Sequence, residues 1–153
     1  MTFSLNEIEA MCKRAARGAG LPWGLAEEAG KAARWLTAHG QPGPEILAEL
    51  LTRNDGKAYG ILAPTSTEGE WRAPSGELCP LISGAALSDR ASKVAAGSEI
   101  DFGTTAFPLL LGPYVAGVAE LTGAAVELSW PGATMIVTPA GLAIDGDEAA
   151  VRA

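Results

Sequence analysis

The sequence predicts an α+β fold: an N-terminal helical unit, a loop-rich middle, and a C-terminal three-stranded antiparallel sheet packed on a core helix. Three observations lead to this prediction. Apolar residues recur at steps of three and four through residues 1–53, which is the period of a helix. Residues 54–105 are rich in glycine, proline and polar side chains, which is typical of loops with one short helix. Residues 106–145 begin with an apolar helix and then alternate apolar with polar side chains, which is the period of strands.

The first predicted helix begins at a capping box, Ser4 followed three residues later by Glu7, and ends near Ala19. Its apolar stripe is expected to face inward and consists of Leu5, Ile8, Cys12, Ala15 and Ala19. We interpret Cys12 as a small buried hydrophobe rather than a reactive thiol, because it lies on this stripe.

The second predicted helix runs from Pro22 to Gly40 and is expected at the centre of the helical unit. Its inner stripe consists mainly of alanine, which allows neighbouring helices to approach closely: Ala26, Ala29, Ala33 and Leu36. A third helix is predicted over residues 45–53 after Pro44, with leucine and isoleucine on its inner face. On the outer faces we expect the i, i+4 ion pairs Glu9–Lys13 and Glu27–Lys31.

The middle of the chain predicts less regular structure. Residues 59–63 form a brief apolar segment that is compatible with a strand, and residues 83–96 predict a helix. Trp71 lies in a long polar loop between them. A large aromatic residue at such a place either anchors the loop by packing or contacts a ligand or partner subunit.

The last part predicts an apolar core helix that ends at Gly123, followed by a meander. Its strands are expected at residues 126–130, 134–138 and 142–144, with the core helix covering their apolar face. Residues 146–153 are expected to be a frayed tail. A chain of 153 residues is expected to form a single domain.

Composition narrows the classes of function. The net charge is −7, and residues 54–153 hold 12 of the 18 acidic side chains but only five of the 11 basic ones. Such a surface repels phosphate backbones and anionic lipids, so nucleic-acid binding and membrane binding are not expected. A mean hydropathy of +0.17 is high for a monomer and favours a homo-oligomer.

Metal and redox chemistry find little support in the sequence. The two cysteines, Cys12 and Cys79, lie far apart, and neither has a second cysteine or histidine at metal-ligand spacing. We therefore expect no metal site and no cofactor. The N-terminus does not resemble a signal peptide, and the longest apolar run is too short to span a bilayer, so a cytoplasmic protein is expected.

The run RGAGLPWGLAEEAGKAARW, from Arg17 to Trp35, resembles the N-terminal signature of an uncharacterised family of small bacterial proteins classed as a domain of unknown function. The similarity extends to the segment CPLISGAALSD, Cys79 to Asp89. The resemblance implies a bacterial source and no particular activity, so no functional residue can be transferred from the family.

If the protein binds a ligand, we expect it at the turn between the first two helices. Trp23 offers an apolar wall, the free amides of the second helix offer donors, and Arg17 offers a cation. Glu27 and Glu28 place negative charge in the same first turn, so we expect a small zwitterionic or neutral polar ligand rather than a phosphate.

Two classes of function remain open. The protein is predicted to be a self-associating small-ligand-binding or accessory protein, with Arg17, Trp23 and Glu28 at the site. The alternative is a small cofactor-independent enzyme, in which Glu28 with Arg17 supplies an acid or base, or Cys79 supplies a nucleophile. A competing interpretation of these charges is a structural Glu–Arg ion pair between the first two helices.

Overall fold

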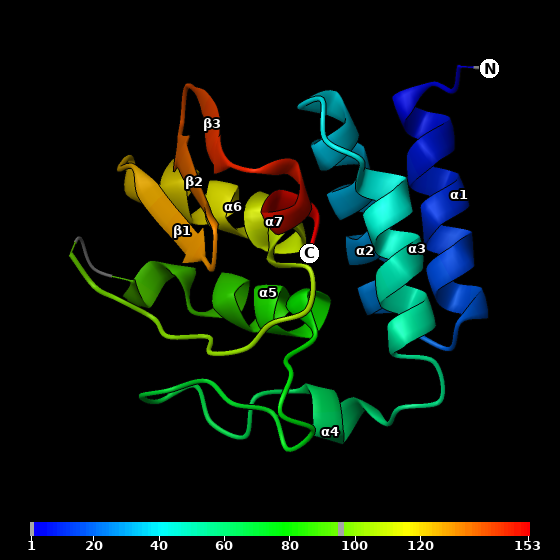
Figure 1. Ribbon diagram of the computed structural model, residues 1–153, viewed down its shortest axis with the longest axis horizontal. Coiled ribbons are helices and arrows are strands. Elements are labelled where there is room, and N and C mark those ends of the chain that lie inside the picture. Colours follow the sequence, from blue (N-terminus) through cyan, green and yellow to red (C-terminus); the bar gives the residue numbers. More distant parts are fainter. Residues whose placement is uncertain (1, 95–96) are drawn as a thin grey trace. The chain divides into compact units, whose positions relative to one another are not determined.

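The computed structural model describes residues 2–94 and 97–153 and confirms the α+β class, with helices and one three-stranded antiparallel sheet (Figure 1). The chain divides into two compact units, Met1–Lys57 and Ala58–Ala153. We call them the three-helix unit and the sheet unit. The expectation of a single domain stays a prediction.

The three-helix unit confirms the three predicted helices. They are α1 (Leu5–Gly18), α2 (Trp23–Ala38) and α3 (Gly43–Arg53). The predicted capping box is present: the Ser4 hydroxyl accepts from the Glu7 amide at 3.1 Å, and the Glu7 carboxylate accepts from the Ser4 amide at 2.7 Å. These bonds satisfy two amides that a helix start would otherwise leave without a partner.

The alanine stripe makes α2 the centre of its unit, as predicted. All four residues of the stripe have no exposed surface: Ala26, Ala29, Ala33 and Leu36. Two glycines bring the helices still closer, because a Cβ at Gly30 would lie 2.7 Å from the backbone oxygen of Glu9, and a Cβ at Gly43 would clash with the backbone of Ala33. α2 therefore packs backbone against backbone on both neighbours.

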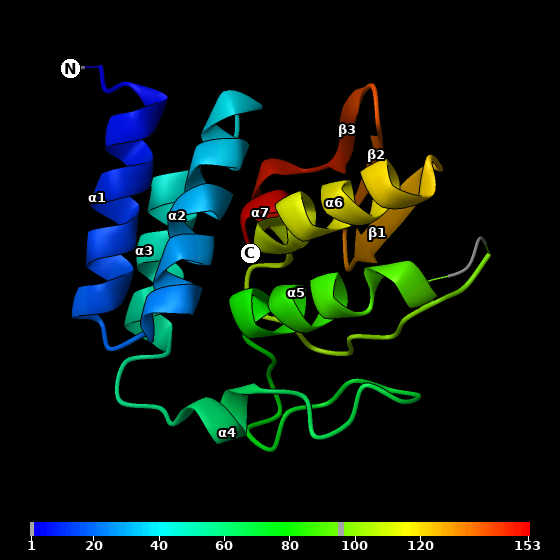
Figure 2. The same ribbon diagram turned by 180° about the vertical axis from the view of Figure 1, so that it is seen from behind.

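The sheet unit is a layered structure. Its elements are α4 (Tyr59–Leu62), α5 (Pro80–Asp89), the short 3₁₀ helices η1 (Ala91–Lys93) and η2 (Pro108–Leu111), α6 (Gly112–Thr122), β1 (Val126–Trp130), β2 (Ala133–Thr138), β3 (Gly141–Gly146) and α7 (Glu148–Arg152). α6 lies between the sheet and α5, as both ribbon views show (Figures 1 and 2). Gly84 of α5 provides the close approach, because a Cβ there would overlap the Tyr114 ring of α6.

The predicted meander and its covering helix are confirmed. The strand order is β1-β2-β3 with antiparallel pairing, and Leu128 lies opposite Met135, which lies opposite Ile144. Met135 has no exposed surface, and Val137 is also buried, because this face of the sheet packs on α6. The alternation of side chains thus places one face in the core and the other in solvent.

Two expectations in the middle of the chain are wrong. Residues 59–63 form the single helical turn α4 and not a strand; the carbonyl groups of Ile61 and Leu62 accept from the amides of Ser75 and Cys79, which are loop partners rather than a neighbouring strand. The helix expected over residues 83–96 begins earlier, at Pro80, and ends at Asp89; the end of the expected range, residues 95 and 96, lies outside the described residues.

The C-terminal tail is also not frayed as expected. Asp147 caps α7 by accepting from the Ala150 amide at 2.7 Å, and the Trp130 indole donates to the Ala150 carbonyl at 2.8 Å. Val151 is buried. The cap orders the tail as a helix, and the bond from Trp130 attaches that helix to β1; only the cap is visible in the local sequence.

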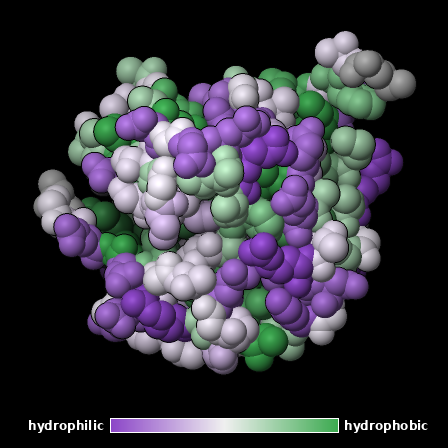
Figure 3. Space-filling view, viewed as in Figure 1, coloured by the Kyte–Doolittle hydropathy of each residue, from purple (hydrophilic) through white to green (hydrophobic). Residues whose placement is uncertain are grey.

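Large apolar side chains that remain accessible are distributed over both units. They are Phe3, Met11, Trp23, Tyr59, Ile61, Leu121 and Ile136. On the face seen in Figure 3, hydrophobic residues form several separate green areas between hydrophilic ones. Single exposed apolar residues are common on protein surfaces and do not by themselves indicate a binding site.

Candidate functional site

An open groove lies between α1 and α3 of the three-helix unit and has a volume of about 490 Å³. Its lining consists of Met11, Cys12, Ala15, Ala19, Pro44, Leu47, Ala48, Leu51, Thr52 and Asp55. Apolar walls with a few polar groups, and a volume of this order, are typical of small-molecule sites. We call this feature the α1–α3 groove.

Small side chains on both helices keep the groove open. Ala15 and Ala19 follow each other at a helical spacing on α1 and are exposed, and Ala48 is exposed on α3. The sequence had placed Ala15 and Ala19 on the buried stripe of α1, and this is a correction: the buried residue is Ala16. Ala16 continues the buried row of Ile8 and Cys12 at steps of four residues.

Cys12 is part of the groove lining and is 4% exposed, which confirms its interpretation as a buried hydrophobe. Burial raises the pKa of its thiol, and the negative charge of Glu45 raises this pKa further. Both effects oppose the thiolate, which is the nucleophilic form. Cys12 therefore contributes to the apolar lining and is not an activated nucleophile.

Thr52 and Asp55 are the polar groups of the groove. The Thr52 hydroxyl donates to the Ala48 carbonyl at 2.9 Å, so it can offer a ligand only its acceptor lone pairs. Asp55 follows the C-cap of α3, and among residues 2–94 and 97–153 no ion pair involves its carboxylate. This part of the groove can therefore accept a cation or a hydrogen-bond donor.

At the turn between α1 and α2, the structure brings together two of the three predicted ligand-binding residues. The Arg17 guanidinium lies 5.0 Å from the centre of the Trp23 ring and donates to the Leu21 carbonyl at 3.0 Å. The Lys13 amine lies 5.7 Å from the same ring. Trp23 is 58% exposed. The indole is thus flanked by two cations on an accessible part of the unit.

Glu28, the third predicted residue, has a different partner. Its carboxylate lies 4.0 Å from the Lys31 amine, whereas Glu27 lies 3.7 Å from Lys13, so the expected i, i+4 pair of Glu27 with Lys31 is wrong. Neither carboxylate lies in the first turn of α2, because that turn ends before Glu27. The expected opposition of these charges to an anion at the helix start is therefore weaker than predicted.

The structural ion pair between the first two helices is present, but with other residues. Arg34 of α2 lies 2.8 Å from the Glu9 carboxylate of α1 and donates to Asn6 at 2.6 Å. Glu9 therefore does not pair with Lys13 as expected, because the neighbouring helix supplies a better-placed guanidinium.

Cys79, the predicted alternative nucleophile, belongs to the sheet unit, whereas Arg17 and Glu28 belong to the three-helix unit. It is the N-cap of α5 and is 5% exposed, and its amide donates to the Leu62 carbonyl at 3.1 Å. A thiol this inaccessible is a poor starting point for nucleophilic catalysis.

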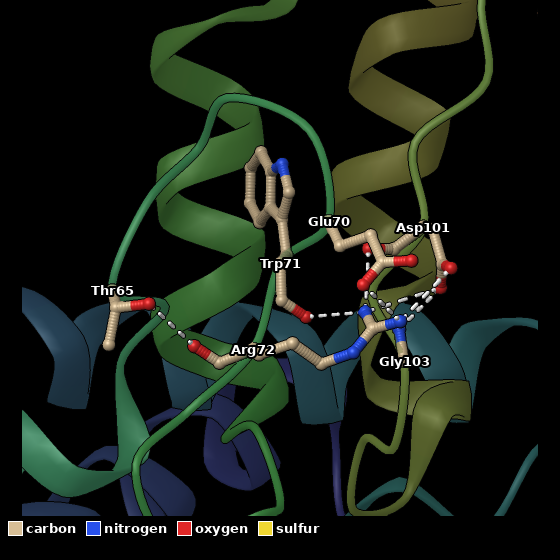
Figure 4. A network of polar contacts seen from close by, with 6 residues as sticks. All are labelled: Thr65, Glu70, Trp71, Arg72, Asp101 and Gly103. Carbon is tan, nitrogen blue, oxygen red and sulfur yellow. Dashed lines mark hydrogen bonds and ion pairs between the residues drawn. The ribbon is translucent and has the colours of Figure 1, made fainter.

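Trp71 acts as the loop anchor that the sequence offered as one alternative. It is 1% exposed, its ring lies edge-on to Phe102 at 4.8 Å, and its amide donates to the Asp101 carbonyl at 2.8 Å. The adjacent Arg72 completes the attachment by donating to the Asp101 carboxylate at 3.1 Å and to the Trp71 carbonyl at 3.0 Å (Figure 4).

The charges of this cluster are satisfied within it. The hydrogen bond from Arg72 lowers the pKa of Asp101, and the Gly103 amide, which donates to Asp101 at 2.8 Å, lowers it further. Glu70 lies 3.3 Å from the Arg72 guanidinium as a second anion (Figure 4). We therefore assign the cluster a structural role.

Sequence reasoning missed the α1–α3 groove. Two rows of residues could have indicated it. Met11, Ala15 and Ala19 form an apolar row beside the buried row of α1, and Pro44, Ala48 and Leu51 form a similar row on α3. A second stripe of this kind on a helix that already has one indicates a further apolar surface.

In residues 2–94 and 97–153, no group of three or more histidine, cysteine, aspartate or glutamate side chains is placed to hold a metal ion. None of the helices in the same ranges has the length and apolar character that a bilayer crossing requires.

Comparison with known proteins supports the resemblance found in the sequence as far as Cys79, and its extension to Asp89 stays a prediction. A family model described as "Protein of unknown function (DUF3726)" matches residues 3–79, about half of the chain. The match includes all of the three-helix unit from Phe3 onward, and with it the α1–α3 groove. No curated protein and no solved structure matches the chain. The bacterial source and the particular signature motif stay predictions. The chain belongs to the family of proteins of unknown function described as DUF3726.

Proposed function

We propose that the protein is a noncatalytic ligand-binding protein, and that a small, mostly apolar ligand with a cationic end binds in the α1–α3 groove. The observation that carries the proposal is the groove itself, with its volume of about 490 Å³ and its apolar walls. This location replaces the predicted turn as the first place to test, because a ligand gains most from a concave apolar surface.

The charge of the ligand follows from the acidic groups nearby. Asp55 lines the groove, and Glu45 is close enough to affect the thiol of Cys12 in its wall. An anionic ligand would meet two negative charges, whereas a cation would gain an interaction with each. The apolar walls of the α1–α3 groove would contact the apolar tail of such a ligand, and the Asp55 carboxylate would bind its cationic end.

Burial of both cysteines supports binding over catalysis. The raised pKa of Cys12 keeps its thiol protonated at neutral pH, and Cys79 is buried. We also propose that the protein works in the cytoplasm, a reducing compartment in which its two free cysteines, Cys12 and Cys79, would remain thiols. The alternative enzyme would need a reactive thiol or a free Glu28, and a rapid reaction of either cysteine with iodoacetamide in the folded protein would favour it.

The ligand class can be tested with three probes that share one tail: octylamine, octanol and octanoate. Isothermal titration calorimetry at low ionic strength should give the order octylamine, octanol, octanoate from tightest to weakest. Ala15→Phe should weaken octylamine binding at least tenfold, because the ring fills the groove. The control Ala10→Phe places the same side chain on the exposed part of α1 outside the lining and should leave binding unchanged.

A second variant tests whether the groove prefers a cationic ligand. Asp55→Asn should reduce the advantage of octylamine over octanol, whereas Glu49→Gln removes an exposed charge of α3 outside the lining and should not. Equal binding of all three probes, or no response to Ala15→Phe, would contradict the proposed site.

The turn between α1 and α2 stays a prediction as a second location, with Arg17, Trp23 and Glu28 as its residues. Trp23→Phe and Arg17→Ala should then weaken a small polar ligand found by a thermal-shift screen while leaving octylamine binding unchanged. A hit that binds both variants as tightly as the parent would exclude the turn.

A further inference from the structure

The sheet ends in a strand with one free edge. β3 pairs only with β2, because the strand order is β1-β2-β3. The β2–β3 turn contains two residues, Pro139 and Ala140, so Thr138 and Gly141 form the hydrogen-bonded pair next to it. By alternation, Ala143 bonds to β2, whereas Leu142 and Ile144 direct their amide and carbonyl groups away from the sheet.

This edge lacks the features that usually prevent strands from pairing. Between Gly141 and Gly146, β3 contains one charged residue, Asp145, and neither lysine nor proline. The opposite edge, β1, also carries one charged residue, Glu127, but the indole at its end, Trp130, is bound to α7. Of the two edges, β3 is therefore the better template for another strand.

We propose that β3 pairs antiparallel with β3 of a second copy of this chain, about a two-fold axis at Ala143. In this register Leu142 lies opposite Ile144 of the partner subunit, and the outward amides and carbonyls of both residues are satisfied in a symmetric set. The two three-stranded sheets then form one sheet of six strands, an ordinary size.

The charge pattern of β3 is self-complementary in this register. Asp145 lies opposite Gly141 of the partner subunit, so the two carboxylates of the dimer do not face each other. A shift of the axis to Asp145 would place like charges directly opposite and is disfavoured. The glycine that ends the β2–β3 turn thus leaves room for the only charge of the strand.

The apolar side chains of β3 also favour a second copy of this chain as the partner. Leu142 and Ile144 are half-buried on the face of the sheet that packs on α6, beside the buried Val137 and Met135. Pairing places these two residues against the same two residues of the partner subunit, which extends the apolar layer across the axis. A second copy therefore supplies both the backbone groups and the apolar side chains that this edge lacks.

The pairing is independent of the proposed ligand, because the α1–α3 groove and β3 belong to different units. Sedimentation velocity of the full chain should show a dimer at micromolar concentration. Ala143 is exposed on the outer face of the sheet, and at the axis it lies opposite itself at a Cα distance of about 4.5 Å.

A charged side chain at residue 143 tests where the proposed two-fold axis lies. Ala143→Lys alone and Ala143→Glu alone should each weaken the dimer roughly three- to tenfold, because like charges meet across the axis. An equal mixture of the two variants should restore the dimer. The control Ile136→Lys adds the same charge to the same exposed row, but on the central strand, and should leave the dimer intact.

A cross-link provides the second measurement. Ala143→Cys should form a disulfide-linked dimer under mild oxidation, because its Cα separation across the axis suits a disulfide, whereas Ile136→Cys should not. A parent chain that sediments as a monomer, or a dimer that Ala143→Lys, Ala143→Glu and Ala143→Cys leave unchanged, would overturn the proposal.

Discussion

The three-helix unit brings its helices together at alanine and glycine, whereas the sheet unit, besides its close approach at Gly84, depends on large buried side chains and on bonds between distant loops. Gly30 and Gly43 let α2 approach its neighbours at backbone distance. In the sheet unit, Trp71 fills the interior and Arg72 attaches its loop to Asp101, which is 29 residues away.

The difference determines which substitutions each unit tolerates. A unit packed on small residues has no room for added atoms, so it is most sensitive to overpacking. The sheet unit buries large side chains, of which Trp71 is the largest, and it is most sensitive to their loss, because a cavity remains behind. The following predictions test this contrast.

Trp71→Ala should have the largest effect, a loss of about 3–5 kcal/mol in the free energy of unfolding. The indole is fully buried and holds the loop against Phe102. Urea unfolding followed by circular dichroism would measure the loss. Trp23→Ala, an exposed tryptophan of the other unit, is the control and should cost much less; equal losses would remove the contrast.

Ala29→Leu and Ala33→Leu should each destabilise the three-helix unit by about 1–3 kcal/mol. Both alanines are fully buried on α2, where added methyl groups must displace the neighbouring helices. The urea midpoint of each variant would show the change. Ala10→Leu, on the exposed side of α1, is the matched control. If both buried variants unfold like the parent, close packing does not limit this unit.

Ser4→Ala should destabilise α1 by about 1 kcal/mol, because it removes the capping bond to the Glu7 amide. The Ser4 amide lowers the pKa of Glu7 most and the Ser4 side chain lowers it further, so this pKa should rise only part of the way to its ordinary value in the variant, which keeps the amide. Nuclear magnetic resonance titration of the Glu7 carboxyl would show the shift. Ser66→Ala, in a loop of the sheet unit, should leave that pKa unchanged.

A low pH should reduce the free energy of unfolding of the sheet unit, and we expect this effect to be smaller than the preceding ones. The pKa of Asp101 is lowered in the folded chain, so its contribution is present above the ordinary pKa of an aspartate and is lost as the pH falls through the lowered value. Asp101→Asn should therefore make unfolding less dependent on pH in this acidic range than in the parent. Urea midpoints at a series of pH values would measure the slope, and an unchanged slope would contradict the assignment.

The contrast also explains what the sequence could predict. The helices of the first unit and the strands of the meander repeat a local period, so residues such as Ala29, Ala33 and Leu128 could be placed in the core from spacing alone. The capping box at Ser4 is local in the same sense. The burial of Trp71 could be predicted from the size of its side chain. The residue that it contacts could not be predicted.

The remainder depends on contacts that spacing does not encode. α4 became a helical turn because loop amides bind its carbonyls, and α7 is held by the indole of Trp130, 20 residues away. The partner of Glu9 was misassigned because Arg34 comes from another helix. The α1–α3 groove was missed for a related reason, since a groove is defined by the distance between helices and not by the stripe of either one.

The placement of tryptophan gives each unit its own optical signal. Trp23 and Trp35 belong to the three-helix unit, and Trp71 and Trp130 belong to the sheet unit. Trp71 is 1% exposed and Trp23 is 58% exposed, so the first should emit at shorter wavelength and resist acrylamide quenching, and the second should be quenched readily. Single-tryptophan variants would therefore report the melting of each unit without any label, and transitions that do not coincide would reveal units that unfold separately.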